Sequence, residues 1–165
     1  MIASLYYFLP VLVANAVPVL VRRLNFLNIP ISTSLFGKNK TVRGFVCGVS
    51  AGMLVYAVQY FLFYLDILSG ISLINYVDMP ILLGLLLPLG ALLGDLFESY
   101  VKRRLHKKPG SNWYPYDQYD FIVGALIVSA PVYIVQGPVL LIALTVIPLL
   151  SFISSKLAVK LQMKG

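Results

Sequence analysis

Charged residues are scarce in this chain, and acidic residues are the scarcest of them. Only 12% of the 165 residues are charged, whereas a soluble domain has about 25%. Six acidic residues stand against 13 Lys and Arg, 59% of the residues are hydrophobic, and the mean hydropathy is +0.88. A soluble chain of this length could not bury so much apolar surface. The composition therefore excludes an ordinary soluble domain and predicts that lipid surrounds most of the chain.

Cysteine and histidine are almost absent as well. Cys47 is the single cysteine, so no intramolecular disulfide can form, and nothing in the sequence resembles a Cys/His metal cluster or a Ser-His-Asp triad. The apolar N-terminal run has no basic segment before it and is followed by Arg22 and Arg23, which argues against a cleaved signal peptide. No repeat or low-complexity segment divides the chain, which indicates one transmembrane domain over 1–165.

Long apolar runs are what the chain does contain. A helix needs about 17–25 residues to span a bilayer, and five runs approach or reach this length when flanking aromatics are included. We therefore predict an all-α integral membrane protein with five transmembrane helices, over 2–21, 45–65, 79–100, 120–136 and 138–156.

The basic residues are confined to alternate connections between these runs. All 13 Lys and Arg lie in the loops 22–44 and 101–119 or near the C-terminus, and the connections 66–78 and 136–138 contain none. Cytoplasmic loops carry an excess of Lys and Arg. The pattern predicts a multi-pass protein of the cell membrane with its N-terminus outside, its C-terminus cytoplasmic and both basic loops at the cytoplasmic face.

Four of the six acidic residues form two pairs near that face, Asp95 with Glu98 and Asp117 with Asp120. A spacing of three residues puts both members of a pair on one face of a helix. The pairs are expected to converge at the inner edge of the hydrocarbon core, where carboxylates repel one another unless a cation lies between them. Mg²⁺ prefers such oxygen ligands together with phosphates. The alternative is that the acids only form ion pairs with Lys102, Arg103 or Arg104, although acids inside a membrane span are usually functional.

A basic loop precedes the second predicted helix, with the sequence Gly37-Lys38-Asn39-Lys40-Thr41-Val42-Arg43-Gly44. A helix N-terminus has free N–H groups and partial positive charge, so the assembly suits a polyphosphate. It is not a Walker A motif, because Asn39 follows Gly37-Lys38. The alternative is a loop that only follows the topology rule or contacts anionic head groups. The expected position of the loop opposite the two acid pairs favours the phosphate side of a metal–nucleotide site.

These motifs resemble those of the membrane cytidylyltransferases that make CDP-activated lipids. The chain has Gly94-Asp95-x-x-x-Ser99-x-x-Lys102-Arg103, then Pro109-Gly110, then Asp117-Gln118-Tyr119-Asp120. Gln118 in place of Arg, and the missing His-Gly-Gly, depart from the pattern of the bacterial and eukaryotic phosphatidate cytidylyltransferases. The short chain and the loop at 37–44 are similar to the archaeal branch, the CDP-archaeol synthases.

The resemblance implies transfer of a cytidylyl group from CTP to an isoprenoid ether lipid phosphate, 2,3-di-O-geranylgeranylglyceryl 1-phosphate. CDP-archaeol and pyrophosphate would be the products, with Mg²⁺ as cofactor, membrane lipids around the protein and no nucleic-acid partner. The implied metal ligands are Asp95, Asp117 and Asp120. The implied contacts to nucleotide and phosphates are Asn15, Gly37, Lys38, Asn39, Lys40, Thr41 and Arg43, with Ser99, Lys102 and Arg103 receiving the lipid phosphate or the leaving pyrophosphate.

Two other classes remain open from the residues alone. A CDP-alcohol phosphotransferase-like lipid enzyme also carries acids on membrane helices, but its Asp-Gly…Ala-Arg…Gly…Asp…Asp motif is absent. A small membrane transporter would account for intramembrane acids, but it needs a polar path through the membrane, and the outer halves of the runs are almost purely apolar.

Overall fold

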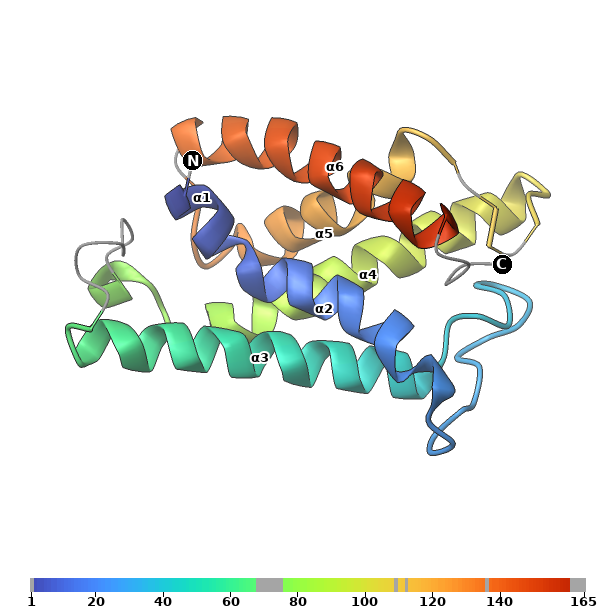
Figure 1. Ribbon diagram of the computed structural model, residues 1–165, viewed down its shortest axis with the longest axis horizontal. Helices are drawn as coiled ribbons and strands as arrows, with labels where there is room; N and C mark the ends of the chain where they lie inside the picture. Colours follow the sequence, from blue (N-terminus) through green and yellow to red (C-terminus); the bar gives the residue numbers. More distant parts are fainter. Residues whose placement is uncertain (1, 68–75, 109, 112, 136, 161–165) are drawn as a thin grey trace.

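The computed structural model describes residues 2–67, 76–108, 110–111, 113–135 and 137–160, with the side chains of 154–160 left out. Within these residues the protein is helical and has no strand, which confirms the all-α class (Figure 1). The helices are α1 (Ile2–Tyr7), α2 (Leu9–Leu20), α3 (Val42–Tyr64), α4 (Leu83–Arg104), α5 (Asp120–Ser129) and α6 (Gly137–Lys160), with single 3-10 turns η1 (Val21–Arg23), η2 (Tyr76–Asp78) and η3 (Tyr116–Gln118).

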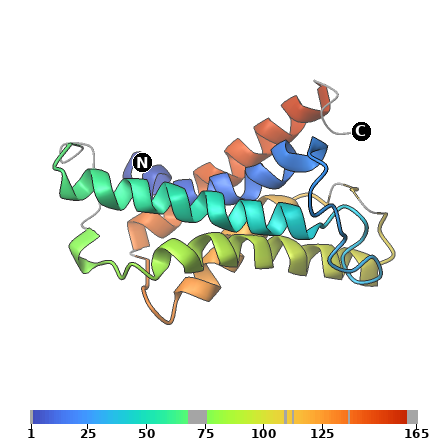
Figure 2. The same ribbon diagram turned by 90° about the horizontal axis from the view of Figure 1, so that it is seen from below.

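Helix α4 lies at the centre of the packing. It contacts α5, α3 and α2, and α3 and α4 lie side by side in Figure 2, whereas Figure 1 shows α4 crossing behind α3 at an angle. Leu83, Leu87 and Ala91 on α4 are fully buried. They recur at the four-residue spacing that puts side chains on one face of a helix. Helix α4 is therefore the element against which α2, α3 and α5 pack, and it carries two acids, Asp95 and Glu98.

Among the described residues, two helices are long and apolar enough to cross a membrane, Val42–Tyr64 and Leu83–Arg104. Helix α3 begins three residues before the predicted span because Thr41 caps it, its side-chain oxygen accepting from the N–H of Gly44 at 3.2 Å. Helix α4 begins later than predicted, because a turn with i→i+3 hydrogen bonds follows Pro80 and the helix starts only at Leu83.

The first and fourth apolar runs are less continuous than predicted. The run 2–21 contains two helices with a break at Phe8, just before Pro10 in the first turn of α2. The run 120–136 is helical only as far as Ser129, because the chain turns before Pro131. Helix α5 has 10 residues and is therefore about 15 Å long, half of a ~30 Å hydrocarbon core. The number of membrane crossings stays a prediction.

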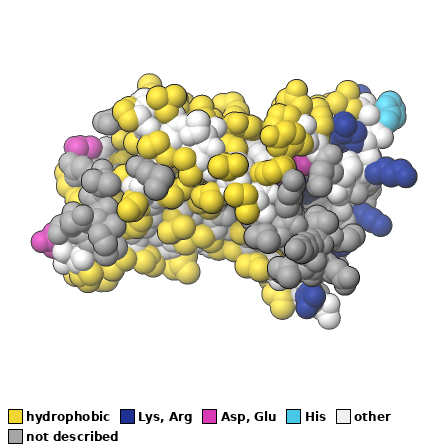
Figure 3. Space-filling view, turned by 45° about the horizontal axis from the view of Figure 1, so that its top comes forward, with side chains coloured by type: hydrophobic (Ala, Val, Ile, Leu, Met, Phe, Trp, Pro, Cys, Tyr) yellow, Lys and Arg dark blue, Asp and Glu magenta, His cyan; other side chains and the backbone are white. Residues whose placement is uncertain are grey.

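Charge is distributed unevenly over the surface. In the space-filling view Lys and Arg side chains gather at one end of the molecule, and apolar side chains cover the middle (Figure 3). Large apolar residues such as Leu54, Phe61 and Ile127 are more than 60% exposed. An exposed apolar belt of this kind is typical of a protein that has lipid as its solvent.

Candidate active site

Two glycines set the distance between α4 and α5. A Cβ atom at Gly94 would lie 2.1 Å from the carbonyl oxygen of Asp120, and one at Gly124 would lie 2.3 Å from the carbonyl oxygen of Gly90. No side chain fits at these positions, and small residues let membrane helices approach closely. Because Asp95 follows Gly94 directly, this contact brings the Asp95 carboxylate beside the first residue of α5, which is Asp120.

Three carboxylates converge at this contact. Asp95 and Glu98 on α4 and Asp120 on α5 each offer one oxygen atom, and these oxygens all lie within 4.8 Å of one another. Glu98 is buried, whereas Asp95 and Asp120 are half-buried. Oxygen donors at this spacing fit a hard divalent cation such as Mg²⁺. From the sequence alone, two roles are open for Glu98, an ion-pair partner or a residue of the site. Its three-residue spacing from Asp95 is the signal that it faces the site.

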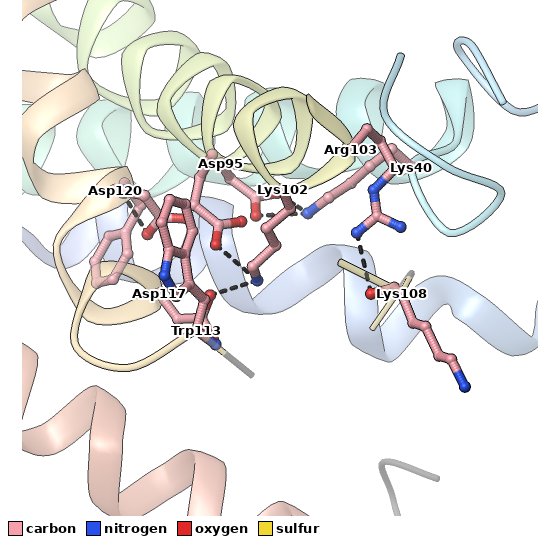
Figure 4. A network of polar contacts seen from close by, with 10 residues as sticks. Lys40, Asp95, Lys102, Arg103, Lys108, Trp113, Asp117 and Asp120 are labelled. Carbon is pink, nitrogen blue, oxygen red and sulfur yellow. Dashed lines mark hydrogen bonds and ion pairs between the residues drawn. The ribbon is translucent and has the colours of Figure 1, made fainter. Parts of the chain in front are cut away.

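The basic loop reaches this cluster through Lys40. Its ammonium group donates to both carboxylate oxygens of Asp95 (Figure 4). The loop is held in place by its backbone, since the N–H of Ile31 donates to the carbonyl oxygen of Lys40 at 2.8 Å and a β-bridge joins Pro30 to Thr41. The predicted approach of this loop to the acids is therefore found at Lys40.

Lys102 connects the cluster to the loop before α5. Its ammonium nitrogen lies 2.6 Å from a Glu98 oxygen and 2.5 Å from an Asp117 oxygen, and the other Asp117 oxygen accepts from the backbone N–H of Trp113 at 2.6 Å (Figure 4). Burial raises the pKa of the Asp117 carboxyl, but its hydrogen bonds with Glu98, Lys102 and Trp113 lower it by more, so its pKa lies below the ordinary value. Asp117 is thus held as an anion beside Lys102.

The structure gives Asp117 a different setting from the predicted one. Asp117 lies in η3, whereas Asp120 begins α5, so the two acids are not on one turn of a common helix. Asp117 is also outside the group of three converging carboxylates. Its oxygens are engaged by an ammonium group and a backbone N–H, as the ion-pair alternative describes.

Arg43 is buried away from the cluster. Only 2% of the residue is exposed, and its guanidinium donates to the carbonyl oxygens of Arg22 and Leu24 and, at 3.1 Å, to the side-chain oxygen of Asn28. Because these acceptors hold both terminal nitrogens, Arg43 fixes the chain between η1 and α3 instead of presenting a cation to a phosphate, the role that the sequence suggested for it.

The remaining loop residues divide by exposure. Lys38 and Asn39 are exposed, whereas Gly37 is buried with a φ of 86°, a conformation that favours glycine. The side-chain nitrogen of Asn39 lies 3.4 Å from the position of a Cβ at Gly110, so the loop at 37–44 comes beside Gly110. Pro109, the other residue of that predicted motif, lies outside the described residues. Thr41 uses its side-chain oxygen as the cap of α3.

Three further predicted residues are not members of the carboxylate cluster. Ser99 is buried, next to Glu98 in α4. Arg103 donates from its Nη2 to the carbonyl oxygen of Lys108 at 3.0 Å. Asn15 is half-buried on α2, and its side chain makes no hydrogen bond with the described residues. Its contact to a nucleotide stays a prediction.

Comparison with known proteins agrees with this site. The family model of the CarS-like family, CDP-archaeol synthase, matches residues 1–165. The chain belongs to the CDP-archaeol synthase family. The expected activity class, a cytidylyltransferase that acts on a lipid phosphate, is therefore confirmed.

Relatives in the CDP-archaeol synthase family cover most of the chain. The CDP-archaeol synthase of Pyrococcus furiosus is 32% identical over 171 residues, which span 98% of this chain and 95% of that protein. The CDP-archaeol synthase of Methanoregula boonei is 40% identical over 125 residues, 70% of either chain. A solved structure of an intramembrane enzyme for archaeal membrane lipids biosynthesis has a TM-score of 0.70 and 29% identity, covering 92% of this chain and 91% of the other. This chain is accordingly a membrane protein.

Proposed function

We propose that this enzyme transfers a cytidylyl group from CTP to 2,3-di-O-geranylgeranylglyceryl 1-phosphate, releasing CDP-archaeol and pyrophosphate. Family membership supports the reaction class. The observation that carries the proposal is the meeting of the Asp95–Glu98–Asp120 carboxylates with Lys40 and Lys102. A metal-binding set of oxygens beside two ammonium groups matches the needs of a triphosphate and its cation.

We assign the cation to Asp95, Glu98 and Asp120. Mg²⁺ usually takes one or two protein carboxylates and completes its octahedron with water and phosphate oxygens. When bound, it would neutralise phosphate charge at the reacting centre. We assign Asp117 to hold Lys102 in place, because Asp117 contacts the Lys102 ammonium group and the backbone N–H of Trp113 and lies outside the group of three converging carboxylates.

We assign the phosphates to ammonium groups around this cluster. Lys40 and the exposed Lys38 are suited to the β- and γ-phosphates, and Lys102 to the lipid phosphate or the leaving pyrophosphate. An oxygen of the lipid phosphate attacks the α-phosphorus of CTP, and the bond from that phosphorus to the oxygen that bridges to the β-phosphorus breaks. No protein nucleophile is required, so catalysis consists mainly of positioning and charge neutralisation.

We place this site at the cytoplasmic face of the cell membrane. The restriction of all 13 Lys and Arg to alternate connections supports that orientation. CTP would then arrive from the cytoplasm, while the lipid phosphate is presented from the inner leaflet on its two apolar chains.

An assay with purified protein tests the proposal. The protein in detergent is given radiolabelled CTP, the lipid phosphate and a Mg²⁺ titration, and label is followed into the lipid fraction together with released pyrophosphate. We expect label transfer that requires both Mg²⁺ and the lipid phosphate, with one pyrophosphate released per labelled lipid. Transfer without added metal after chelation, or pyrophosphate release without labelled lipid, would contradict it.

A further inference from the structure

A polar pocket lies at the C-terminal end of α4. Its volume is about 440 Å³, and it is lined by Ser34, Leu35, Tyr100, Arg103, Arg104 and His106. It therefore combines two guanidinium groups, two hydroxyl groups and an imidazole, and no carboxylate of a described residue lines it. Every polar side chain in its wall can donate a hydrogen bond.

This pocket is separate from the carboxylate cluster. Tyr100 and Arg104 are four residues apart and share one face of α4, whereas Lys102, which faces Glu98 and Asp117, is two residues from each and points elsewhere. Arg104 also lies nine residues beyond Asp95, roughly 13 Å along the helix axis. A group in the pocket is too far from the cluster to react there, since reacting atoms approach to about 3–3.5 Å.

The donors in the pocket are partly prearranged. Arg104 donates from Nε to the Tyr100 hydroxyl at 3.0 Å, and its guanidinium lies 5.3 Å from the centre of that ring, so the side chain is held against α4. Arg103 has one terminal nitrogen on the Lys108 carbonyl, while its Nε is buried without a hydrogen-bond partner among the described residues. A buried donor without an acceptor is costly, and an anion oxygen would relieve that cost.

We propose that this pocket is a second phosphate-binding site, distinct from the reaction centre. Its ligand is a phosphate group, carried either by an anionic lipid head group or as a free anion. Paired arginines suit phosphate because their planar donors match its oxygens. Leu35 in the wall is 44% exposed, and Leu105, which stands between Arg104 and His106 in the sequence, is 54% exposed, so exposed apolar residues accompany the cations. This combination favours a lipid head group as the ligand, because basic pockets at the cytoplasmic ends of membrane helices bind anionic head groups.

The test uses the full chain in a neutral detergent, titrated with phosphatidylglycerol, phosphatidylcholine or inorganic phosphate. Bound lipid is counted by native mass spectrometry. We expect one tightly retained phosphatidylglycerol and no comparable retention of phosphatidylcholine. Arg104→Gln should weaken that retention roughly tenfold, the effect of one charge-assisted contact. The matched control is Arg23→Gln, which removes the same charge from an exposed site outside the pocket and should retain the lipid.

The outcomes separate the two sources. Displacement of the lipid by inorganic phosphate would support a pocket that takes the free anion, and retention in its presence would support the head group with its chains. Equal losses in Arg104→Gln and Arg23→Gln, or equal retention of both lipids, would overturn the proposal. Cytidylyl transfer measured in parallel should be unchanged in Arg104→Gln, so failure of this site and failure of the proposed reaction are distinguishable.

Discussion

Lys40 and Asp95, 55 residues apart in the sequence, meet in an ion pair in which the ammonium group contacts both carboxylate oxygens. Lys40 comes from the loop before α3, and Asp95 comes from the middle of α4. This pair joins the basic loop to the acid cluster, so the predicted phosphate side and the predicted metal side form one site. The side chains of both residues are about one-quarter exposed, at 26% and 23%, which leaves them accessible to a ligand.

Lys40→Met should weaken CTP binding without unfolding the protein. The variant keeps the length of the side chain and removes one charge-assisted contact, so the dissociation constant should rise about tenfold. Equilibrium binding of labelled CTP in the presence of Mg²⁺ measures it, with Arg23→Met as the control at an exposed position. Unchanged CTP affinity would indicate that the loop is basic only because it lies on the cytoplasmic side and that Lys40 does not bind a phosphate.

Arg43→Met should affect stability and not primarily nucleotide affinity. The variant leaves the carbonyl oxygens of Arg22 and Leu24 and the side chain of Asn28 without their buried donor. The expected cost is about 1–3 kcal/mol, seen as a lower melting temperature. CTP affinity measured well below that temperature should stay within about threefold of the parent, less than the tenfold loss of a charge-assisted contact. A tenfold loss of affinity at unchanged melting temperature would instead support a phosphate contact.

Asp95→Asn, Glu98→Gln and Asp120→Asn should each raise the Mg²⁺ concentration needed for half-maximal activity. Each substitution keeps the shape of the side chain but removes the charge that binds a hard cation. Mutating residues that only hydrogen-bond to metal ligands typically lowers metal affinity or activity about 10- to 100-fold. Removing a ligand charge should therefore raise the required Mg²⁺ concentration by at least that factor. Melting temperature is measured in parallel.

Asp117→Asn provides the contrast within the same network. It should lower the melting temperature, because Lys102 loses a partner at 2.5 Å, while the Mg²⁺ requirement of the remaining activity should change little. If Asp117→Asn shifted the Mg²⁺ requirement as much as Asp120→Asn does, Asp117 would have to be counted among the ligands.

Gly94→Ala should separate α4 from α5 and disrupt the site. The new methyl group would lie 2.1 Å from the Asp120 carbonyl oxygen, and overpacking of this kind costs about 1–3 kcal/mol. Both melting temperature and transferase activity should fall. Gly137→Ala is the control, since a Cβ atom there meets nothing within 4 Å. Normal activity in Gly94→Ala would show that the close contact is not required.

The membrane orientation predicts opposite labelling of two exposed positions. In a Cys47→Ser background, Asn39→Cys should react with an impermeant maleimide only from the cytoplasmic side. Val77→Cys, at a residue that is 68% exposed, should react only from the outside. Spheroplasts and inverted vesicles provide the two sides. Labelling of both from one side would invalidate the topology.

The sequence by itself determined the helical class, the end of the molecule at which the site lies, and most of the residue types that form the site. These follow from composition and local pattern, because apolar runs form helices in lipid and basic residues mark the cytoplasmic connections. Asp95 stood out because it is an acid inside an apolar run. The ends of α1, α2 and α5 were harder to predict, since hydropathy continues through Phe8 and Ala130 while the backbone does not.

Only the tertiary structure decided which charges meet. Lys40, Arg43 and Lys102 are equivalent cations to a sequence pattern, yet Lys40 contacts Asp95, Arg43 holds backbone carbonyls, and Lys102 lies between Glu98 and Asp117. The convergence of Asp95 with Asp120 likewise depends on how closely α4 approaches α5, which Gly94 and Gly124 permit. Ionic interactions depend on distances of a few ångströms, and such distances are set by packing rather than by the order of residues along the chain.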